Sequence, residues 1–361
     1  MQMEFNEWLR ASLPKLAQCR ALLGFDGFID TPAKLQSITG MRDLADYLTK
    51  RDGMSGALEL DEMPRKLGGN MPITANALGC LGLKSACIGA VDDPMFEAMS
   101  KNCILYPIAP PGRCTALEFE SGKLMLSSSA SIRSLDYAVI IDKIPTAELI
   151  DLHNQADLWG YFNWSELPGM TDILSGLLRE IMPNITKKPR ILFIDLSDCT
   201  GRSHEDITGA LKLLTRFNSH AETVLSLNEN EARQLLRAYK IPGEDALSAE
   251  DDNAIQPVMQ NLHDYVGLNH MVIRKNRRVY AGGTRPGDGF AAINTQFVDK
   301  PKLMTGAGDN FNGGIAAALL MGANWTQALT LGTMVSSYYI RNGVSPGPQA
   351  LVDKNHANPD K

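Results

Sequence analysis

An alternation of short apolar runs with amphipathic segments constrains the fold of this chain more than any other feature. Seven apolar runs have the length of buried strands: ALLGF at 21–25, SACIGAV at 85–91, YAVII at 137–141, DLWGYF at 157–162, RILFIDL at 190–196, TVLSLN at 223–228 and HMVIRK at 270–275. Helical candidates lie between and after them, at 72–81, 170–182, 204–217, 230–239 and following Asp309. This alternation predicts an α/β fold with a mostly parallel central sheet flanked by helices.

Two regions interrupt the alternation and predict a second, smaller sheet. One contains three short segments separated by turn residues, CILYP at 103–107, CTALEFE at 114–120 and KLMLSSS at 123–129. The other is the polar stretch 31–66. The chain has 361 residues, 44% of them hydrophobic, which is enough for one large core. We therefore expect a single domain over 1–361, with small-sheet segments near 31–66 and 103–130.

Charge and composition exclude several classes of protein. The net charge is -6 and the 35 Lys and Arg residues are scattered, so the basic face of a nucleic-acid-binding protein is missing. The six cysteines form no CxxC pair, which favours reduced thiols in a cytosolic protein. No apolar run reaches the about 18 residues of a membrane span, and the first residues include acids. We expect a cytoplasmic protein without nucleic-acid or membrane partners.

A glycine-rich turn near the C-terminal end, TGAGD at 305–309, runs straight into an apolar helix. Glycines let the backbone approach a ligand, and the first amides of a helix have no internal partners, so the turn fits an anion such as phosphate. The alternative is an ordinary strand-to-helix turn in which Asp309 only complements the helix end. A dinucleotide turn is excluded because Phe311 stands where GxGxxG requires glycine.

Two upstream clusters have the residue types of a small-molecule site. GFDGFID at 24–30 places two carboxylates at the end of the first strand, where α/β proteins bind ligands. KLGGN at 66–70 is a glycine pair that leads into a helix. Asp30 also fits a simple turn, because Thr31 and Pro32 follow it.

The order GFDGFID, GGN, NENE at 228–231 and TGAGDNF resembles the PfkB family of carbohydrate kinases over residues 20–350. The TGAGDNF turn is the most specific element. The resemblance implies a ribokinase-like three-layer sandwich with a small β-sheet lid over the acceptor. It also implies ATP-dependent phosphorylation of a hydroxyl of a sugar or sugar-like small molecule, with Mg²⁺.

The resemblance assigns the chemical step to the TGAGD turn. Asp309 matches the general base that accepts the hydroxyl proton, and the amides of Gly306, Ala307 and Gly308 match the anion hole. Phosphoryl transfer depends mainly on positioning and electrostatics, so these groups are the expected catalytic set. Because a helix N-terminus favours negative charge, we expect a depressed pKa for Asp309.

The family's NxxE motif matches Asn228 and Glu231, which would organise Mg²⁺ through water around the nucleotide phosphates. The same spacing fits a capping box, and both uses are compatible. Thr305, with Asn342 and Gly343 of the closing segment YYIRNGVSPGP, matches further nucleotide-binding positions.

For the acceptor, the family's N-terminal Asp matches Asp30 best, with Asp26 as the rival. The family's glycine pair matches Gly68 and Gly69, whose missing side chains let a sugar lie against backbone. Asn70 follows them as an amide that can hydrogen-bond a hydroxyl.

The chain departs from the family pattern at three places. Ile73 stands where the family has a substrate-contacting Asn. The segment VIRKNRRVYAGG at 272–283 replaces a glycine loop near the phosphates, so either Arg274 or Lys275 supplies charge there or both lie on a surface hairpin. Leu303 replaces an Asp of a monovalent-cation loop, which leaves dependence on potassium open.

Two alternatives share the fold. One is a nucleoside kinase, because Asp30 holds a ribose diol equally well. The other is a non-catalytic sensor that binds sugar or nucleotide without turnover, which the departures at Ile73 and Leu303 motivate. The lid edges of such kinases often pair, so a homodimer through the lid is also expected.

Overall fold

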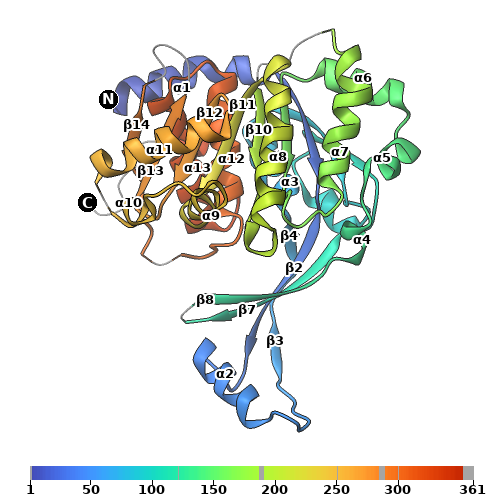
Figure 1. Cartoon of the computed structure of the whole chain (residues 1–361), viewed down its shortest axis with the longest axis vertical. Coiled ribbons are helices and arrows are strands. Elements are labelled where there is room, and N and C mark those ends of the chain that lie inside the picture. The colour runs from blue at the N-terminus through green and yellow to red at the C-terminus, as the bar shows by residue number, and fades with distance from the viewer. Residues whose placement is uncertain are drawn as a thin grey trace.

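The computed structural model describes residues 2–120, 122–186, 191–249, 251–283, 289–299 and 301–352. A large sheet with helices on both faces forms the body, and a small sheet projects from it (Figure 1). The strands are β1 Arg20–Phe25, β2 Phe28–Leu35, β3 Leu60–Glu62, β4 Lys66–Gly68, β5 Lys84–Gly89, β6 Cys103–Pro107, β7 Gly112–Phe119, β8 Gly122–Ser128, β9 Leu158–Phe162, β10 Ile191–Asp195, β11 Glu222–Asn228, β12 His270–Arg274, β13 Arg278–Gly283 and β14 Ala291–Asn294.

The helices differ in length from one turn to five. They are α1 Gln2–Leu16, α2 Met41–Lys50, α3 Asn70–Cys80, α4 Ala130–Arg133, α5 Tyr137–Lys143, α6 Thr146–Gln155, α7 Met170–Gly176, α8 His204–Leu214, α9 Glu229–Tyr239, α10 Glu244–Ser248, α11 Asp252–Val266, α12 Ala307–Leu320, α13 Trp325–Asn342 and α14 Pro348–Val352. Short 3-10 or π segments are η1 Pro94–Ala98, η2 Leu177–Ile181, η3 Met182–Asn184, η4 Cys199–Gly201 and η5 Thr215–Ser219.

The large sheet confirms the predicted α/β architecture. Within the described ranges it has nine strands in the order β14-β13-β12-β11-β10-β9-β1-β5-β6. Neighbours from β12 to β6 pair in parallel, and β13 and β14 add two antiparallel strands at one edge. The sheet is therefore mostly parallel, as the alternation of apolar runs and helices predicts.

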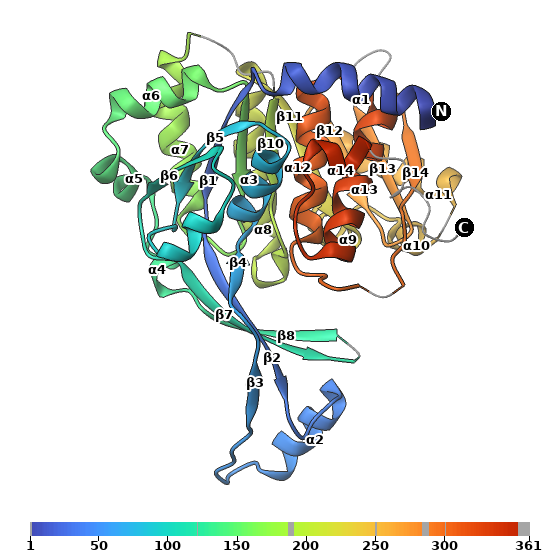
Figure 2. The ribbon, with the colours of Figure 1, turned by 180° about the vertical axis from the view of Figure 1, so that it is seen from behind.

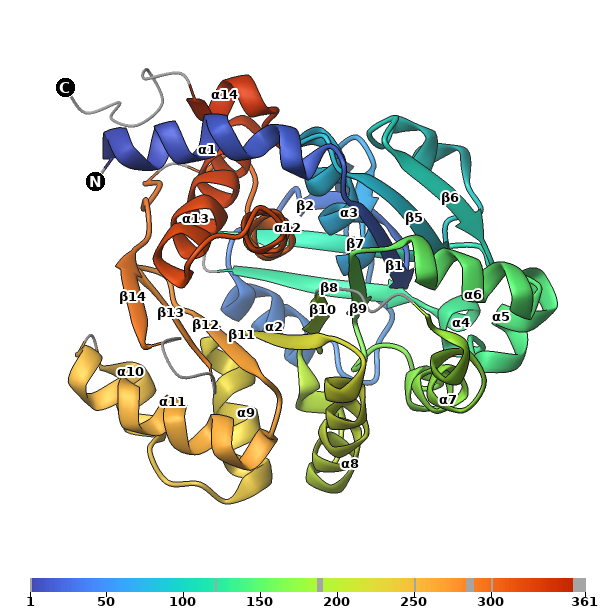
Figure 3. The same ribbon diagram turned by 90° about the horizontal axis from the view of Figure 1, so that it is seen from above.

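Helices cover both faces of this sheet, which gives three layers (Figure 3). One core contains residues of α1, α3, α12, α13 and α14, and the other contains residues of α5 to α9 and α11. Alternate residues of a strand enter opposite cores, as Leu22 and Leu23 of β1 show. Strands buried on both faces explain why the apolar runs are continuous rather than alternating.

The small sheet leaves the body at the carboxyl edge of the parallel strands, because β2 begins shortly after β1 ends. Its strand order is β3-β2-β7-β8, and β4 also pairs with β2. It carries α2 at its far end (Figure 2). Its own core is small, made of Ala33, Leu35, Ile38, Leu44 and Leu117.

Two predicted strands are wrong in place or type. CILYP at 103–107 is not part of the small sheet: it is β6, which pairs in parallel with β5 at the edge of the large sheet. An edge strand is only half buried, so its pattern resembles that of a lid strand. YAVII at 137–141 is helix α5, which Asp136 caps by accepting a hydrogen bond from Val139 N.

The remaining strand and helix predictions are confirmed in type, with ends shifted by a few residues. The predicted start of β10 at Arg190 lies outside the described residues. All six cysteines are free. Within the described ranges no helix is both long and apolar enough to span a bilayer.

Candidate active site

The TGAGD turn enters α12 through a left-handed residue. Gly306 is the N-cap of α12 and has a φ of +87°. A Cβ at this position would lie 2.9 Å from the hydroxyl of Tyr339 and 3.1 Å from Cδ1 of Ile73. Glycine is required here by both the backbone conformation and the close packing. Ile73 therefore packs against the turn, at the position where the resemblance implies a substrate-contacting Asn.

The first turn of α12 offers backbone donors without a side-chain cap. No side chain of the described residues caps this helix end. The Ala307 amide donates to the carbonyl of Met304 at 3.2 Å, which leaves the next amides of the turn, beginning with Gly308, without an intrahelical acceptor. An uncapped helix N-terminus with a glycine-lined approach is a favourable environment for an anion.

Asp309 lies in this first turn and is nearly buried, with 9% of its surface exposed. Burial raises the pKa of Asp309 well above its ordinary value, and the charges of Asp195 and Asp26 raise it further, whereas Arg274 lowers it. The depressed pKa expected from the helix end is therefore wrong. Desolvation and like charge outweigh the partial positive charge of the helix terminus.

Asp26 is fully buried and its carboxylate is saturated with donors. It accepts hydrogen bonds at 2.8 Å from the amides of Asn70 and Met71 and from Nδ2 of Asn163. These two amides are the first of α3, so Asp26 caps that helix from another segment of the chain. Asp26 therefore lies directly against Gly69, the second glycine of the pair.

Asp30 is the carboxylate of the pair that remains available to a ligand. It lies against the glycine pair, because a Cβ on Gly68 would be 2.5 Å from Asp30 Oδ1. Burial raises its pKa to about 6, and the positive charges of Lys123 and Lys66 act in the opposite direction. The predicted acceptor residues therefore assemble as one cluster, with Asp30 as its open carboxylate.

The acceptor cluster and the TGAGD turn meet at Tyr339 of α13. The Tyr339 hydroxyl donates to the carbonyl of Thr305 at 2.9 Å. Burial raises the pKa of Tyr339, and the nearby charges of Asp309 and Asp30 raise it further. Helices α3 and α12 also pack closely, because Gly313 approaches Ala77. Residues far apart in the sequence are thus brought to one place.

Asn228 and Glu231 form the capping box at the start of α9. Asn228 Oδ1 accepts from Glu231 N at 2.9 Å, and Glu231 accepts at 2.7 Å from the amide and from Nδ2 of Asn228. Burial raises the pKa of Glu231 to about 8, with a further contribution from Asp195, while Arg274 lowers it. Glu231 thus belongs to the same charged group as Asp309.

Asp195 at the end of β10 is a site residue that the motif search missed. Its Oδ2 accepts from Nδ2 of Asn312 at 2.7 Å, and its Oδ1 accepts from Ser197 N at 2.9 Å. Ser197 has a φ of +62° and its hydroxyl donates to Oδ1 of Asn70 at 3.1 Å. The available signal was a carboxylate directly after an apolar run, at the carboxyl end of a strand.

Arg274 ends β12 and points into the site, with 17% of its side chain exposed. Its Nη2 lies 3.8 Å from Oδ2 of Asp195, and its Cζ lies 5.5 Å from the ring centre of Phe311. Lys275 instead donates to the carbonyl of Ala249. Of the two cations left open by the sequence, Arg274 is the one that faces the TGAGD turn.

The other predicted nucleotide positions flank the segment that leads into the turn. Lys123 of β8 donates to Oγ1 of Thr305 at 2.8 Å, which joins the small sheet to the turn. Lys302 donates to the carbonyl of Asn342 at 3.1 Å. Gly343, with a φ of +74°, ends α13 beside them.

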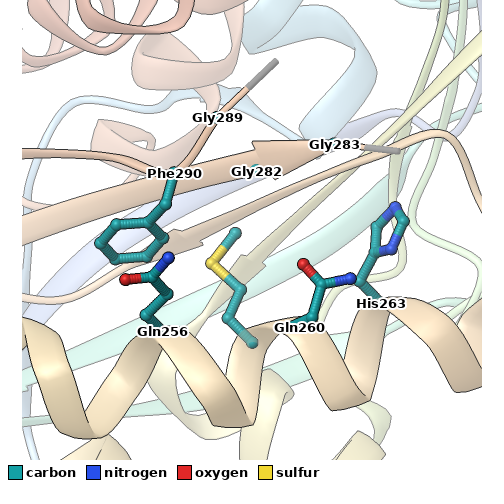
Figure 4. A pocket seen from close by; sticks show the side chains of 8 residues that line it. Gln256, Gln260, His263, Gly282, Gly283, Gly289 and Phe290 are labelled. Atoms are coloured by element: carbon teal, nitrogen blue, oxygen red, sulfur yellow. The ribbon is translucent and has the colours of Figure 1, made fainter. Parts of the chain in front are cut away.

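The structure has a separate cavity of about 210 Å³ between α11 and β13 (Figure 4). It is lined by Gln256, Gln260, His263 and Phe290, among others. Gly283 in its wall pairs with His270, at the opposite end of β12 from Arg274. This cavity is therefore distant from the charged cluster.

The charged cluster contains carboxylates, the ligand type that Mg²⁺ prefers, but it does not form a metal cage. Among the described residues no three His, Cys, Asp or Glu side chains are grouped to hold a metal. Mg²⁺ usually takes one or two carboxylates, and water and phosphate oxygens complete its shell. Three carboxylates lie close together here, those of Asp195, Glu231 and Asp309, and the pKa of the last two is raised. Added positive charge would therefore stabilise their ionised forms.

Comparison with known proteins identifies the family. The family model described as prokaryotic ketohexokinase matches residues 6–355. The chain belongs to the prokaryotic ketohexokinase family. It is therefore a carbohydrate kinase, a phosphotransferase, and the resemblance to sugar kinases of the PfkB type is confirmed.

Individual relatives agree with this family assignment. A ketohexokinase of Haloferax volcanii is 26% identical over 356 residues, which cover 93% of this chain and 91% of that protein. A ribokinase of Cryptococcus neoformans var. grubii, solved with ADP, has a TM-score of 0.65 at 19% identity and covers 92% of this chain and 98% of its own. A ribokinase of Thermotoga maritima has a TM-score of 0.61 at 16% identity, with coverages of 92% and 98%. These two structures confirm the ribokinase-like fold.

Proposed function

We propose that this chain transfers the γ-phosphoryl group of ATP to a hydroxyl of a ketohexose, with Asp309 as the general base. The observation that carries the proposal is the buried Asp309 carboxylate in the uncapped first turn of α12, near Tyr339, on which the charges of both Asp309 and Asp30 act. The ketohexose is taken from the family and from the Haloferax relative.

The acceptor is held by the cluster at the ends of β1 and β4. Ionised Asp30 accepts hydrogen bonds from sugar hydroxyls. Gly68 and Gly69 leave room for the sugar ring beside the backbone, and Asn70 adds an amide. Asp26 supports this cluster by capping α3 and does not contact the acceptor.

In the chemical step, the acceptor oxygen attacks the γ-phosphorus while the bond from phosphorus to the ADP oxygen breaks. The hydroxyl proton passes to Asp309. The backbone amides of Gly306 and Gly308 hold the charge on the phosphoryl group, whereas the Ala307 amide donates to Met304. Donors aimed at such charge contribute about 3 kcal/mol each in other enzymes. Thr305 keeps the turn in place through its contacts with Tyr339 and Lys123.

The raised pKa of Asp309 suits this role. A carboxylate with an ordinary pKa is a weak base at neutral pH, whereas a raised pKa brings the base closer to the working pH. The charge of Arg274 opposes the rise and favours the ionised form that accepts the proton.

Mg²⁺ fits the oxygen-rich group around Glu231. Asn228 and Glu231 would hold it through water, and when bound it would neutralise charge on the nucleotide phosphates. Dependence on a monovalent cation stays open, because the apolar Leu303 is buried and its amide donates to the carbonyl of Ile340.

The small sheet is the proposed lid. It stands at the carboxyl edge of the large sheet, and Lys123 on β8 already reaches Thr305 of the turn. A lid in this place keeps water from taking the phosphoryl group. Its edge strands β3 and β8 are the proposed contacts of a homodimer.

The test is a coupled ADP-release assay with Asp309→Asn. We expect the wild type to release ADP with a ketohexose, and the variant to lose on the order of 10²-fold or more in kcat, because general-base catalysis supplies that much. A variant with wild-type turnover would remove Asp309 from the mechanism.

A panel of ketohexoses, aldohexoses, pentoses and nucleosides in the same assay identifies the acceptor. Turnover with nucleosides alone would favour the nucleoside-kinase alternative. Binding without turnover of any acceptor would favour the sensor.

A further inference from the structure

The hairpin between β12 and β13 carries four cations, and they have different surroundings. Lys275 donates to the carbonyl of Ala249, and Arg278 forms an ion pair with Asp252. Arg277 lies over the ring of Phe297, with Cζ 4.6 Å from its centre. Of these four residues, Arg274 is the one that faces the start of α12.

The guanidinium of Arg274 lies directly against the backbone of Gly308. A Cβ built on Gly308 would collide with Nη1 of Arg274 and lie 3.1 Å from its Cζ. Gly308 lies inside α12 and has no left-handed backbone that requires glycine. The missing side chain therefore leaves space for the guanidinium next to the backbone amides of the turn.

The guanidinium of Arg274 also has N–H donors that a ligand can use. Its Nε is buried and has no hydrogen-bond partner among the described residues. The contact of Nη2 with Asp195, at 3.8 Å, is longer than a direct hydrogen bond. A buried unpaired donor is costly, and the cost is removed when a ligand oxygen accepts from it.

The charge balance around Arg274 points to an anionic ligand with its own cation. Three carboxylates, Asp195, Glu231 and Asp309, lie close enough to interact electrostatically with one guanidinium. Asp195 already accepts hydrogen bonds from Asn312 and Ser197. Arg274 thus has no single close ion-pair partner among the described residues. Its guanidinium packs over the ring of Phe311.

We propose that Arg274 binds the γ-phosphoryl group during transfer, with its guanidinium and the Gly308 amide on neighbouring phosphoryl oxygens. A planar fork of N–H donors matches phosphate oxygens, and it stabilises charge that spreads over them in the transition state. This inference rests on the proposed function, because it gives a new residue to the same phosphoryl site.

The competing role for Arg274 is structural: neutralising buried carboxylates without touching the nucleotide. A structural role predicts loss of stability in proportion to loss of activity, and no preference for ligands that carry a γ-phosphate. Three variants separate the two roles: Arg274→Ala, Arg274→Lys and, as a control on the same hairpin, Arg277→Ala.

The first measurement is steady-state turnover with thermal unfolding alongside. We expect Arg274→Ala to lose on the order of 10²-fold in kcat, as for removal of one charge-stabilising donor, with KM for the sugar unchanged. Added guanidinium ion at millimolar concentration restores part of this loss, and Arg274→Lys retains an intermediate rate. Arg277→Ala loses little and shows no rescue. A kcat of Arg274→Ala close to wild type, or a loss that follows unfolding without rescue in either Arg274 variant, overturns the inference.

The second measurement separates this inference from the proposed function. Calorimetry compares ADP with a non-hydrolysable ATP analogue, each with Mg²⁺ and without sugar. In Arg274→Ala and Arg274→Lys the affinity for the analogue falls by about tenfold or more, and that for ADP changes little, because a charged hydrogen bond to the γ-phosphate is lost. Equal losses for both ligands contradict the inference, whether or not the wild type phosphorylates a sugar.

Discussion

The two glycine turns of the site share a positive φ but differ in ψ, which is 145° at Gly69 and 0° at Gly306, and in their proposed roles. Gly69 before α3 has a φ of +89°, and Gly306 before α12 has a φ of +87°. Each begins a helix without a side-chain cap of its own. The amides that open α3 donate to the carboxylate of Asp26, whereas no side chain among the described residues caps the start of α12.

The difference fits the proposed roles of the two turns, acceptor binding at Gly69 and phosphoryl transfer at Gly306. A helix N-terminus attracts negative charge, and at α3 the protein supplies that charge itself. At α12 we propose that a ligand supplies the negative charge. Burial raises the pKa of both Asp26 and Asp309, but at Asp26 the hydrogen bonds from Asn163, Met71 and Asn70 oppose the rise.

The largest expected difference between the two turns is in how much a variant at Asp26 or at Asp309 lowers the free energy of unfolding. Asp26→Ala removes the acceptor of two helix amides and of Asn163, and leaves buried donors unpaired, so the free energy of unfolding should fall by about 3 kcal/mol. Asp309→Ala removes a buried carboxylate that Asp195 repels, so it should lower the free energy of unfolding far less. Urea unfolding of both variants measures the difference. Equal destabilisation would show that the two turns are not distinct.

Substituting the paired glycines sharpens the comparison. Gly69→Ala and Gly306→Ala each force alanine to adopt a positive φ, which costs about 1–3 kcal/mol of stability. Gly69→Ala should mainly weaken sugar binding, because its Cβ would lie 2.9 Å from Oδ2 of Asp26.

Gly306→Ala should mainly lower kcat, because its Cβ would press on Tyr339 and shift the phosphoryl turn. Separate measurement of kcat and of KM for each substrate distinguishes the two variants. The same kinetic defect in both would contradict the division of roles.

The smallest expected effect is a shift in the pH dependence of acceptor binding. Because the pKa of Asp30 is raised to about 6, the free protein holds Asp30 protonated below that pH, and sugar affinity should fall on acidification through it. Lys123 lowers this pKa, so Lys123→Met should move the loss of affinity to higher pH.

Calorimetric titration of the sugar without nucleotide, between pH 5 and 8 in steps of about half a unit, measures this shift. Asp30→Asn is the control, and its affinity should not vary with pH in this range. An unchanged profile in Lys123→Met would show that the lid lysine does not act on Asp30.

The sequence predicted most of the residues that the structure brings together at the candidate site, because its motifs are local. TGAGD, the glycine pair and the capping box of Asn228 and Glu231 depend on backbone preferences and on spacing within one turn of helix. Strands buried on both faces produce continuous apolar runs, so the large sheet was also predictable. The half-buried β6 and the short apolar helix α5 were misread, because each has a pattern shared by two kinds of structure.

Local pattern and spacing thus determined the fold class, the two glycine turns and the family resemblance. Tertiary structure decided which charges meet. Asp26 and Asp30 differ by four positions, yet one is saturated by α3 and the other faces the site. Asp195 ends β10 and Arg274 ends β12, with β11 between them, and the two side chains lie near Gly308 and Asp309, which are far away in the sequence. Burial and the proximity of like charges set their pKa values, and both arise only when distant segments pack together.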